Sequence, residues 1–309
     1  MSENDELKKL FEGVIPERLD EVLSLIESHS AQFRRVDDKS DFNLDAGAFG
    51  AIQFAQRFLG QLWLFDFAGL YALHSFSGVI FFVKSRGLKF DIAEIDGLPE
   101  QKEENNRFSK IIKTIQRLNS AESKYDFAWP AGIPKLQEGK PKDIEQAAVF
   151  DLVLMATTYF FLHELKHVIF KSEGSSAEDR LIEEMECDAF AAERMLSKIR
   201  DYSSASGYPE DKVFMKRSIS IALGSAFLAV ATPRHNLGGT ATHPAVHDRW
   251  SATLGRIELE EDDSYWLYFA SLAIALLKHR KITFPSQLVV SYKQLAVATI
   301  KALEEASNK

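Results

Sequence analysis

Cysteine is almost absent from this chain of 309 residues, which has a single one, Cys187. One thiol cannot form an internal disulfide or supply the several thiolates of a structural zinc site, so a metal here would have to bind histidine and carboxylate side chains. The same scarcity favours a reducing compartment, the cytoplasm. Lys and Arg never occur in runs longer than two and the net charge is −8, so no nucleic-acid partner is expected.

Long uninterrupted apolar runs are also missing. The N-terminus is acidic and lacks the apolar stretch of a secretory signal. Segments 59–83 and 149–170 are apolar but contain charged residues, and segment 219–231 is too short to span a bilayer. We therefore expect buried helices of a soluble protein with no integral membrane span. The 23 phenylalanines are a heavy apolar load, which leaves peripheral membrane association open.

Hydrophobic periodicity predicts a helix-dominated α+β fold. Helices are expected over 5–33, 60–76 and 104–120, and strands over 79–83 and 88–95 on either side of a turn at 85–87. Segment 41–58 reads as irregular with a turn at its glycines, and segment 124–143 as a loop rich in proline. From Asp143 the chain is expected to be helical, including a final pair over 265–279 and 286–305, with breaks at 172–176, 201–208, 232–248 and 282–286.

This pattern suggests two regions. Residues 1–140 would form an N-terminal α+β region with a small β-sheet, which recognises the substrate or covers the site. Residues 141–309 would form a helical core that carries the chemistry.

The sequence His163-Glu164-Leu165-Lys166-His167 stands on the long apolar helix. Residues four apart lie on one helical face, so both imidazoles can reach one metal ion, and Glu164 beside them can act as general base toward a metal-bound water. Zinc lowers the pKa of such a water to about 7. Chance would produce this motif in about two of a hundred chains of this composition. The alternative is a pair of core histidines, but buried imidazoles and a carboxylate need partners, and a metal supplies them. Lys166 is unusual for a zinc peptidase and must point outward or find a carboxylate.

The following helix offers the third ligand. With 100° per residue and the core stripe centred on Leu181, Glu184 lies at the stripe's edge and Asp188 within it. We predict that Glu184 binds the metal and Asp188 holds the free N–H of a ligand histidine. The alternative is an ion pair of these carboxylates with surface cations. Three other carboxylates of this helix, those of Glu183, Glu186 and Glu193, are predicted to face away from the core. The Cys187 thiol is predicted to face outward as well and to be inert.

Segment 232–250 follows a buried helix and contains His247 and four potential hydrogen-bond donors: Arg234, His235, His243 and Arg249. A peptidase needs donors aimed at the oxyanion of its tetrahedral intermediate. His243 is the first choice, with Arg249 supporting the site; the alternative is that His243-Pro244 merely begins a helix. His29, His74 and His279 have no comparable neighbours and are expected to be structural.

These motifs resemble those of gluzincin metallopeptidases of the CAAX-prenyl-protease type, which are membrane proteins with a longer gap between the motifs. The length of the chain, the position of the motif and the residue sequence from Glu184 to Ala191 are more similar to the Lit family of bacterial phage-exclusion peptidases. The resemblance covers about 163–250. It implies a bacterial, zincin-like endopeptidase that, on sensing phage infection through an activating phage peptide, cleaves a host protein, in that family elongation factor Tu. It also implies that His163 and His167 bind zinc, that Glu164 is the base, and that Glu184 and His243 act as third ligand and transition-state donor.

The sequence therefore predicts a cytoplasmic zinc endopeptidase with one zinc ion per chain and a protein substrate. Two alternatives stay open: a regulatory metallopeptidase that cleaves a repressor, and a non-catalytic interaction protein with a structural metal or none.

Overall fold

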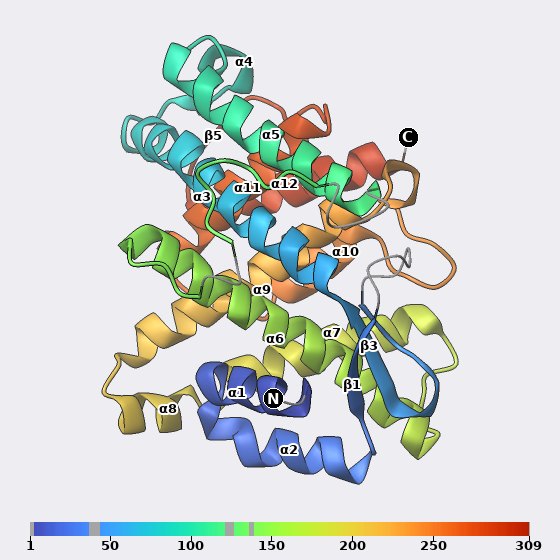
Figure 1. The fold of residues 1–309 in the computed structure, drawn as a ribbon. Coiled ribbons are helices and arrows are strands. Elements are labelled where there is room, and N and C mark those ends of the chain that lie inside the picture. Colours follow the sequence, from blue (N-terminus) through green and yellow to red (C-terminus); the bar gives the residue numbers. More distant parts are fainter. Residues whose placement is uncertain (1–2, 37–43, 121–126, 136–138, 309) are drawn as a thin grey trace.

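The computed structural model describes residues 3–36, 44–120, 127–135 and 139–308. Within them the fold is dominated by helices with a small sheet, as the α+β prediction requires (Figure 1). The major elements in chain order are α1 (Glu3–Val14), α2 (Leu19–Ser28), β1 (Gln32–Val36), β2 (Leu44–Ala46), β3 (Ala51–Ala55), α3 (Gln56–Ser85), β4 (Lys89–Phe90), α4 (Ile92–Ile95), α5 (Pro99–Ser120), α6 (Ile144–Glu173), α7 (Arg180–Leu196), α8 (Ile199–Ser206), α9 (Glu210–Ala231), α10 (Val246–Leu254), α11 (Ser264–His279), β5 (Gln287–Leu288) and α12 (Tyr292–Ser307).

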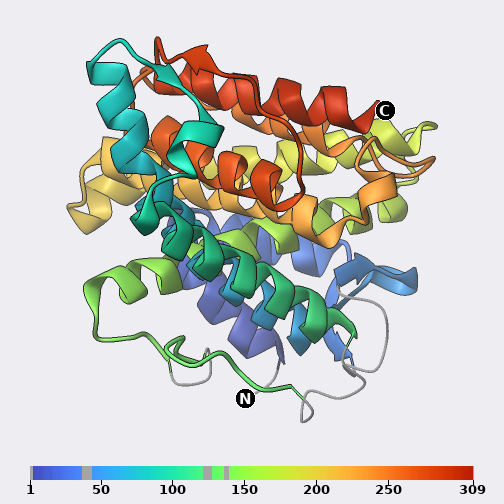
Figure 2. The same cartoon turned by 90° about the horizontal axis from the view of Figure 1, so that it is seen from above.

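Three long helices, α3, α6 and α9, form the centre of the molecule. Viewed from above, α12 lies on one side of them and the N-terminal helices α1 and α2 on the other (Figure 2). One hydrophobic core runs through the described chain and draws side chains from both the 1–140 and the 141–309 regions. These central helices are long and apolar enough to cross a membrane, yet 50%, 67% and 72% of their most apolar windows are buried inside the protein. No integral span is established by these helices.

The three-stranded sheet has the order β1-β3-β2, with β1 and β3 parallel and β2 antiparallel to β3. Strand β2 is therefore an edge strand. Gly50 at the β2–β3 connection has φ +76°, and a Cβ there would lie 2.7 Å from the Ser30 carbonyl oxygen, so the turn requires glycine. The irregular segment predicted for 41–58 is wrong over 44–46 and 51–58, which form strands and the start of α3; residues 41–43 lie outside the described chain.

The strands predicted at 79–83 and 88–95 are also wrong. The run Val79–Val83 belongs to α3, because Phe76, Ile80 and Val83 are buried at helical spacing while Phe81 and Phe82 are exposed. After the turn, only Lys89–Phe90 is extended, and it pairs with Gln287–Leu288. That pairing holds 287–288 in a strand, so the last helix begins at Tyr292 rather than at 286.

Most other predicted helices are confirmed within small shifts of their ends. The predicted N-terminal helix divides into α1 and α2 and gives way to β1. The break predicted at 201–208 is misplaced, since α8 occupies 199–206 and the chain turns at Ser197-Lys198 and again at Gly207. Residues 127–135 and 139–143 contain no helix or strand, in agreement with the predicted loop, and residues 124–126 and 136–138 lie outside the described chain.

Candidate active site

Helix α6 places the His-Glu-x-x-His motif in the middle of the protein. Asp143 caps its first turn by accepting a hydrogen bond from the Gln146 amide (3.0 Å), and Gly174 ends it in the left-handed conformation. His163, Glu164 and His167 are all buried. Aromatic rings surround this part of the helix: Phe161 packs against Phe33 and Phe54 of the sheet, and Phe160 against Phe58 and Phe227. The dry surroundings strengthen every polar contact made here.

Helix α7 presents acidic side chains to α6. Glu184 and Asp188 are buried, as predicted. Glu183 and Cys187 are buried as well, at 1% and 0% exposure, so the prediction that they face away from the core is wrong. The buried face is centred near Glu184, about 60° around the helix from Leu181, at 100° per residue.

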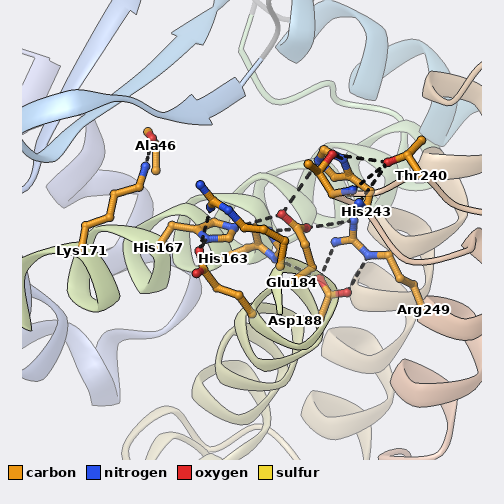
Figure 3. A network of polar contacts seen from close by, with 12 residues as sticks. Ala46, His163, His167, Lys171, Glu184, Asp188, Thr240, His243 and Arg249 are labelled. Carbon is orange, nitrogen blue, oxygen red and sulfur yellow. Dashed lines mark hydrogen bonds and ion pairs between the residues drawn. The ribbon is translucent and has the colours of Figure 1, made fainter. Parts of the chain in front are cut away.

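The two histidines meet one carboxylate. The Nε2 atom of His163 lies 3.5 Å from Glu184 Oε2, and the Nε2 atom of His167 lies 3.3 Å from Glu184 Oε1 (Figure 3). Ligands about 2.0–2.1 Å from a tetrahedral zinc are separated by about 3.3 Å along each edge of the tetrahedron. Both imidazole-to-carboxylate distances, each to a different oxygen of Glu184, are close to that edge length.

The opposite nitrogen of each imidazole is already engaged. His163 Nδ1 donates to Asp188 Oδ1 at 2.9 Å, and His167 Nδ1 donates to Glu183 Oε1 at 2.8 Å. A carboxylate on Nδ1 fixes the ring orientation and leaves Nε2 as the nitrogen that can bind a metal, which would displace any proton from it. Asp188 was predicted for this role, whereas Glu183 was missed.

Asp188 also anchors the surroundings of the site. Arg249 forms a bidentate pair with it, Nε to Oδ2 and Nη2 to Oδ1, both at 2.7 Å, and the Tyr159 hydroxyl donates to it at 2.9 Å. Arg249 Nη1 lies 3.4 Å from Glu184 Oε2. Arg249 is thus a buried support of two carboxylates. Tyr159, four residues before His163 on the same face of α6, could have been found from that spacing.

Charge is unbalanced in this cluster. Four buried carboxylates, those of Glu164, Glu183, Glu184 and Asp188, face two buried cationic groups, the Arg249 guanidinium and the His163 imidazole, and Arg180 reaches Glu183 from the surface at 3.3 Å. Burying like charges together is costly unless a cation accompanies them. The carboxylates therefore create a field that favours a positive ion at the Nε2 atoms.

The pKa values of the buried groups are shifted by the same electrostatic interactions. Burial would lower the pKa of His163, but hydrogen bonds to Asp188 and Glu184 raise it to about 10. Burial would raise the pKa of Glu184 and Asp188, yet the imidazoles and Arg249 hold both well below the usual range. The pKa of Glu164 is raised, chiefly by burial, as suits a group that must accept a proton.

The loop before α10 brings His243 to the edge of the site. Its side chain is 61% exposed, and its Nε2 lies 3.9 Å from Glu184 Oε1. The Thr240 hydroxyl accepts from the His243 amide at 3.1 Å, and the Thr242 hydroxyl contacts the imidazole Nδ1 at 2.9 Å. These contacts hold the ring over the cleft and leave its Nε2 facing the carboxylate (Figure 3). Other histidines lie apart: His29 contacts Ser172 and Glu173, His74 lies near Glu145, and His279 packs on Phe108.

A cleft of about 430 Å³ opens above these groups. One wall is the edge strand β2, and Lys171 of α6 donates to the Ala46 carbonyl of that strand (Figure 3). The aromatic rings of Phe58, Phe160 and Phe227 line the interior. Lys166, which the sequence required to point outward or find a carboxylate, instead lies over the Phe170 ring, 3.8 Å from its centroid.

Cys187 gives the cluster a second set of metal donors. One ligand atom each of His163, His167 and Cys187 lies within 4.8 Å of the others, so these three could hold a metal. Burial and the surrounding carboxylates raise the pKa of this thiol well above its ordinary value, which opposes the thiolate that metals bind. Glu184, whose pKa is held well below its usual range, is ionised and lies 3.5 and 3.3 Å from the two Nε2 atoms, so it fits the chemistry better.

The sequence model of the family described as Peptidase U49 matches residues 52–270, about two thirds of the chain. The chain belongs to the peptidase U49 family. The match runs from β3 to the middle of α11 and so includes every residue of the site apart from those of β2. Neither the curated proteins nor the solved structures contain a match. Membership of peptidase U49 makes the protein a protease, and its substrates are therefore proteins.

Proposed function

We propose that this peptidase U49 member is a zinc-dependent endopeptidase with one zinc ion per chain. The convergence of the His163 and His167 Nε2 atoms on the Glu184 carboxylate, at 3.5 and 3.3 Å, carries the proposal. Two imidazoles and one carboxylate form a common ligand set of catalytic zinc, which leaves a fourth position open. A zinc ion held there would polarise the scissile carbonyl and acidify a bound water.

The protein's own side chains divide the remaining work. Glu164 lies beside the histidines and is the group to take a proton from the attacking water and pass it to the leaving amine. Asp188 and Glu183 hold the imidazoles in the required tautomer, and Arg249 holds Asp188 in place. His243, at the exposed edge of the cleft, is the donor that we assign to the oxyanion of the tetrahedral intermediate.

The substrate would lie along the β2 strand. Among the described residues β2 pairs only with β3, so its other edge borders the cleft without a partner strand. An extended peptide can add to such an edge, which would hold its scissile bond over the histidines. This placement would give the 1–140 region a part in substrate recognition.

The biological role rests on the resemblance to the Lit phage-exclusion peptidases. By that resemblance we propose a bacterial cytoplasmic enzyme of the gluzincin type that is activated by a phage peptide and cleaves a host translation factor. Elongation factor Tu is the first substrate to test.

The decisive experiment replaces the general base. Glu164→Gln should keep zinc, measured by elemental analysis, and lose at least about 100-fold in cleavage of elongation factor Tu or of a denatured general substrate. Glu186→Gln, on the exposed face of α7, is the matched control and should cleave like the wild type. Removing zinc with a chelator should abolish cleavage and adding zinc should restore it. Wild-type cleavage by the Glu164→Gln variant would overturn the mechanism.

A further inference from the structure

A second cavity, of about 370 Å³, lies between the C-terminal end of α1, the first half of α6, and helices α8 and α9. We call it the α8–α9 pocket. Its α6 wall includes Asp151, which stands 12 residues before His163, about 18 Å along the helix axis. Figure 1 shows α8 at the lower left of the molecule, away from the β-sheet at the right that borders the active site, and α9 running from there toward the centre. The pocket is thus separate from the catalytic cleft.

Positive charge is concentrated in this pocket although the whole chain is acidic. The pocket is lined by a single carboxylate, that of Asp151, and by four cationic side chains: Lys140, Lys212, Lys216 and Arg217. Asp151 accepts one hydrogen bond from Lys140 and one from Lys216, both at 2.7 Å. Each ammonium group has three N–H donors, so both lysines keep donors after pairing with the same carboxylate. Of the other acids nearby, Glu17 neutralises Arg217 and Asp211 lies 3.3 Å from Lys212 at the surface.

Arg217 is the most buried cation of the pocket. Its side chain is 1% exposed, and its two terminal nitrogens bond to Glu17 and to the carbonyls of Val14 and Met195. Its Nε–H has no acceptor among the described residues and is closed off from solvent, so Arg217 contributes charge and packing to the pocket wall rather than a free donor.

The wall beside these cations is aromatic. The Tyr202 and Tyr208 rings are nearly parallel, with an angle of 9° between planes and 6.4 Å between centroids, and the Arg217 guanidinium lies 5.1 Å from the Tyr202 centroid. Tyr208 is 61% exposed, so its ring is available to a planar group. An exposed tyrosine next to unsaturated cationic donors suits a molecule that has both a planar ring and an anion.

We propose that the α8–α9 pocket binds a nucleoside monophosphate or a closely related phosphorylated molecule with a planar ring. The phosphate would accept hydrogen bonds from Lys140 and Lys216, and the base would stack on Tyr208. The cavity volume lies in the range typical of small-ligand sites.

The test is calorimetric titration of the full-length protein with adenosine monophosphate, guanosine monophosphate, adenosine and inorganic phosphate. We expect at least one nucleotide to bind with a Kd below about 1 mM, and adenosine and phosphate to bind at least about ten-fold more weakly. Phosphate binding as tight as the nucleotide would overturn the stacking role of the ring. Absence of saturable binding up to about 10 mM nucleotide would overturn the site.

Variants locate the binding. Tyr208→Ala and Lys216→Met should each weaken the nucleotide at least about ten-fold, whereas Lys301→Met, an exposed lysine of α12, should not. Lys140→Met, at the other proposed phosphate donor, is 52% exposed and should weaken the nucleotide to the same degree, which covers the case that Lys216→Met lowers the thermal stability. Unchanged affinity in Tyr208→Ala and Lys140→Met, with wild-type melting, would refute the site. None of these measurements depends on protease activity.

Discussion

The carboxylate of Glu183 gives the sharpest test of the site, because the sequence pattern placed it on the wrong face of α7. It is 1% exposed and accepts the Nδ1–H of His167 at 2.8 Å, so little water competes for this bond. Removing such a partner of a metal-binding histidine typically lowers metal affinity 10- to 100-fold, about 1.4–2.7 kcal/mol. We expect Glu183→Gln, whose amide oxygen can still accept, to lie near the lower end, and Glu183→Leu near the upper end.

The assay is competition for zinc against a fluorescent chelator of known affinity at neutral pH. Glu186→Gln is the matched control, since it removes a carboxylate three residues further along the same helix but from the exposed face. Circular dichroism would verify that each variant is folded. Zinc affinities of both Glu183 variants within two-fold of the control would refute the argument that this carboxylate orients His167.

Three further results follow from the same structure. Zinc content should fall below about one tenth of the wild type in Glu184→Ala and stay near one per chain in Cys187→Ala; the reverse would identify the thiol as the third ligand. Burial raises the pKa of Asp66 well above its usual value, so the folded protein keeps a proton that the unfolded chain releases above about pH 4. The contribution of Asp66 to the unfolding free energy of the wild type should therefore fall by about 1.4 kcal/mol per pH unit as the pH rises toward the folded-state pKa of this group. The variant Asp66→Asn lacks this loss, so in urea titrations its unfolding free energy should rise relative to that of the wild type between pH 4 and pH 7. An equal difference between the two proteins at both pH values would contradict this. Finally, a Cβ at Gly224 would lie 3.1 Å from the Tyr159 ring, so Gly224→Ala should cost about 1–3 kcal/mol in the same titrations, and wild-type stability would show that the ring can move aside.

The residues of the candidate site that lie on one helix were easier to predict from the sequence than the segments that surround them. His163, Glu164 and His167 follow from spacing within one helix, and the family match adds that the chain is a protease. The Glu184–Asp188 pair was found because two carboxylates four residues apart share a face whichever way the helix turns. The roles of His163, His167 and Glu184 as zinc ligands, of Glu164 as base and of His243 as oxyanion donor stay predictions.

Errors arose where the packing of separate segments decides the outcome. Leu181 and Met185 look like part of a core stripe, yet they are only partly buried, whereas Glu183, Cys187 and Ala191 are at most 1% exposed. The apolar run 79–83 suits a strand or a helix equally well, and the periodicity of its burial decides for α3. In the same way, nothing local indicates that 44–46 becomes an edge strand beside the cleft.

The sequence by itself determined which side chains share a helical face, because 3.6 residues per turn is a local property of the backbone. It determined the four-residue spacing of the two histidines of α6, the acidic pair of α7 and the near absence of thiol side chains. Only the tertiary structure decided which face of α7 meets α6, and hence that Glu183 holds His167. It also placed Arg249, 61 residues beyond Asp188, on that carboxylate, and seated Lys166 on an aromatic ring. Such choices depend on contacts between segments far apart in the chain, whose free energies no local pattern contains.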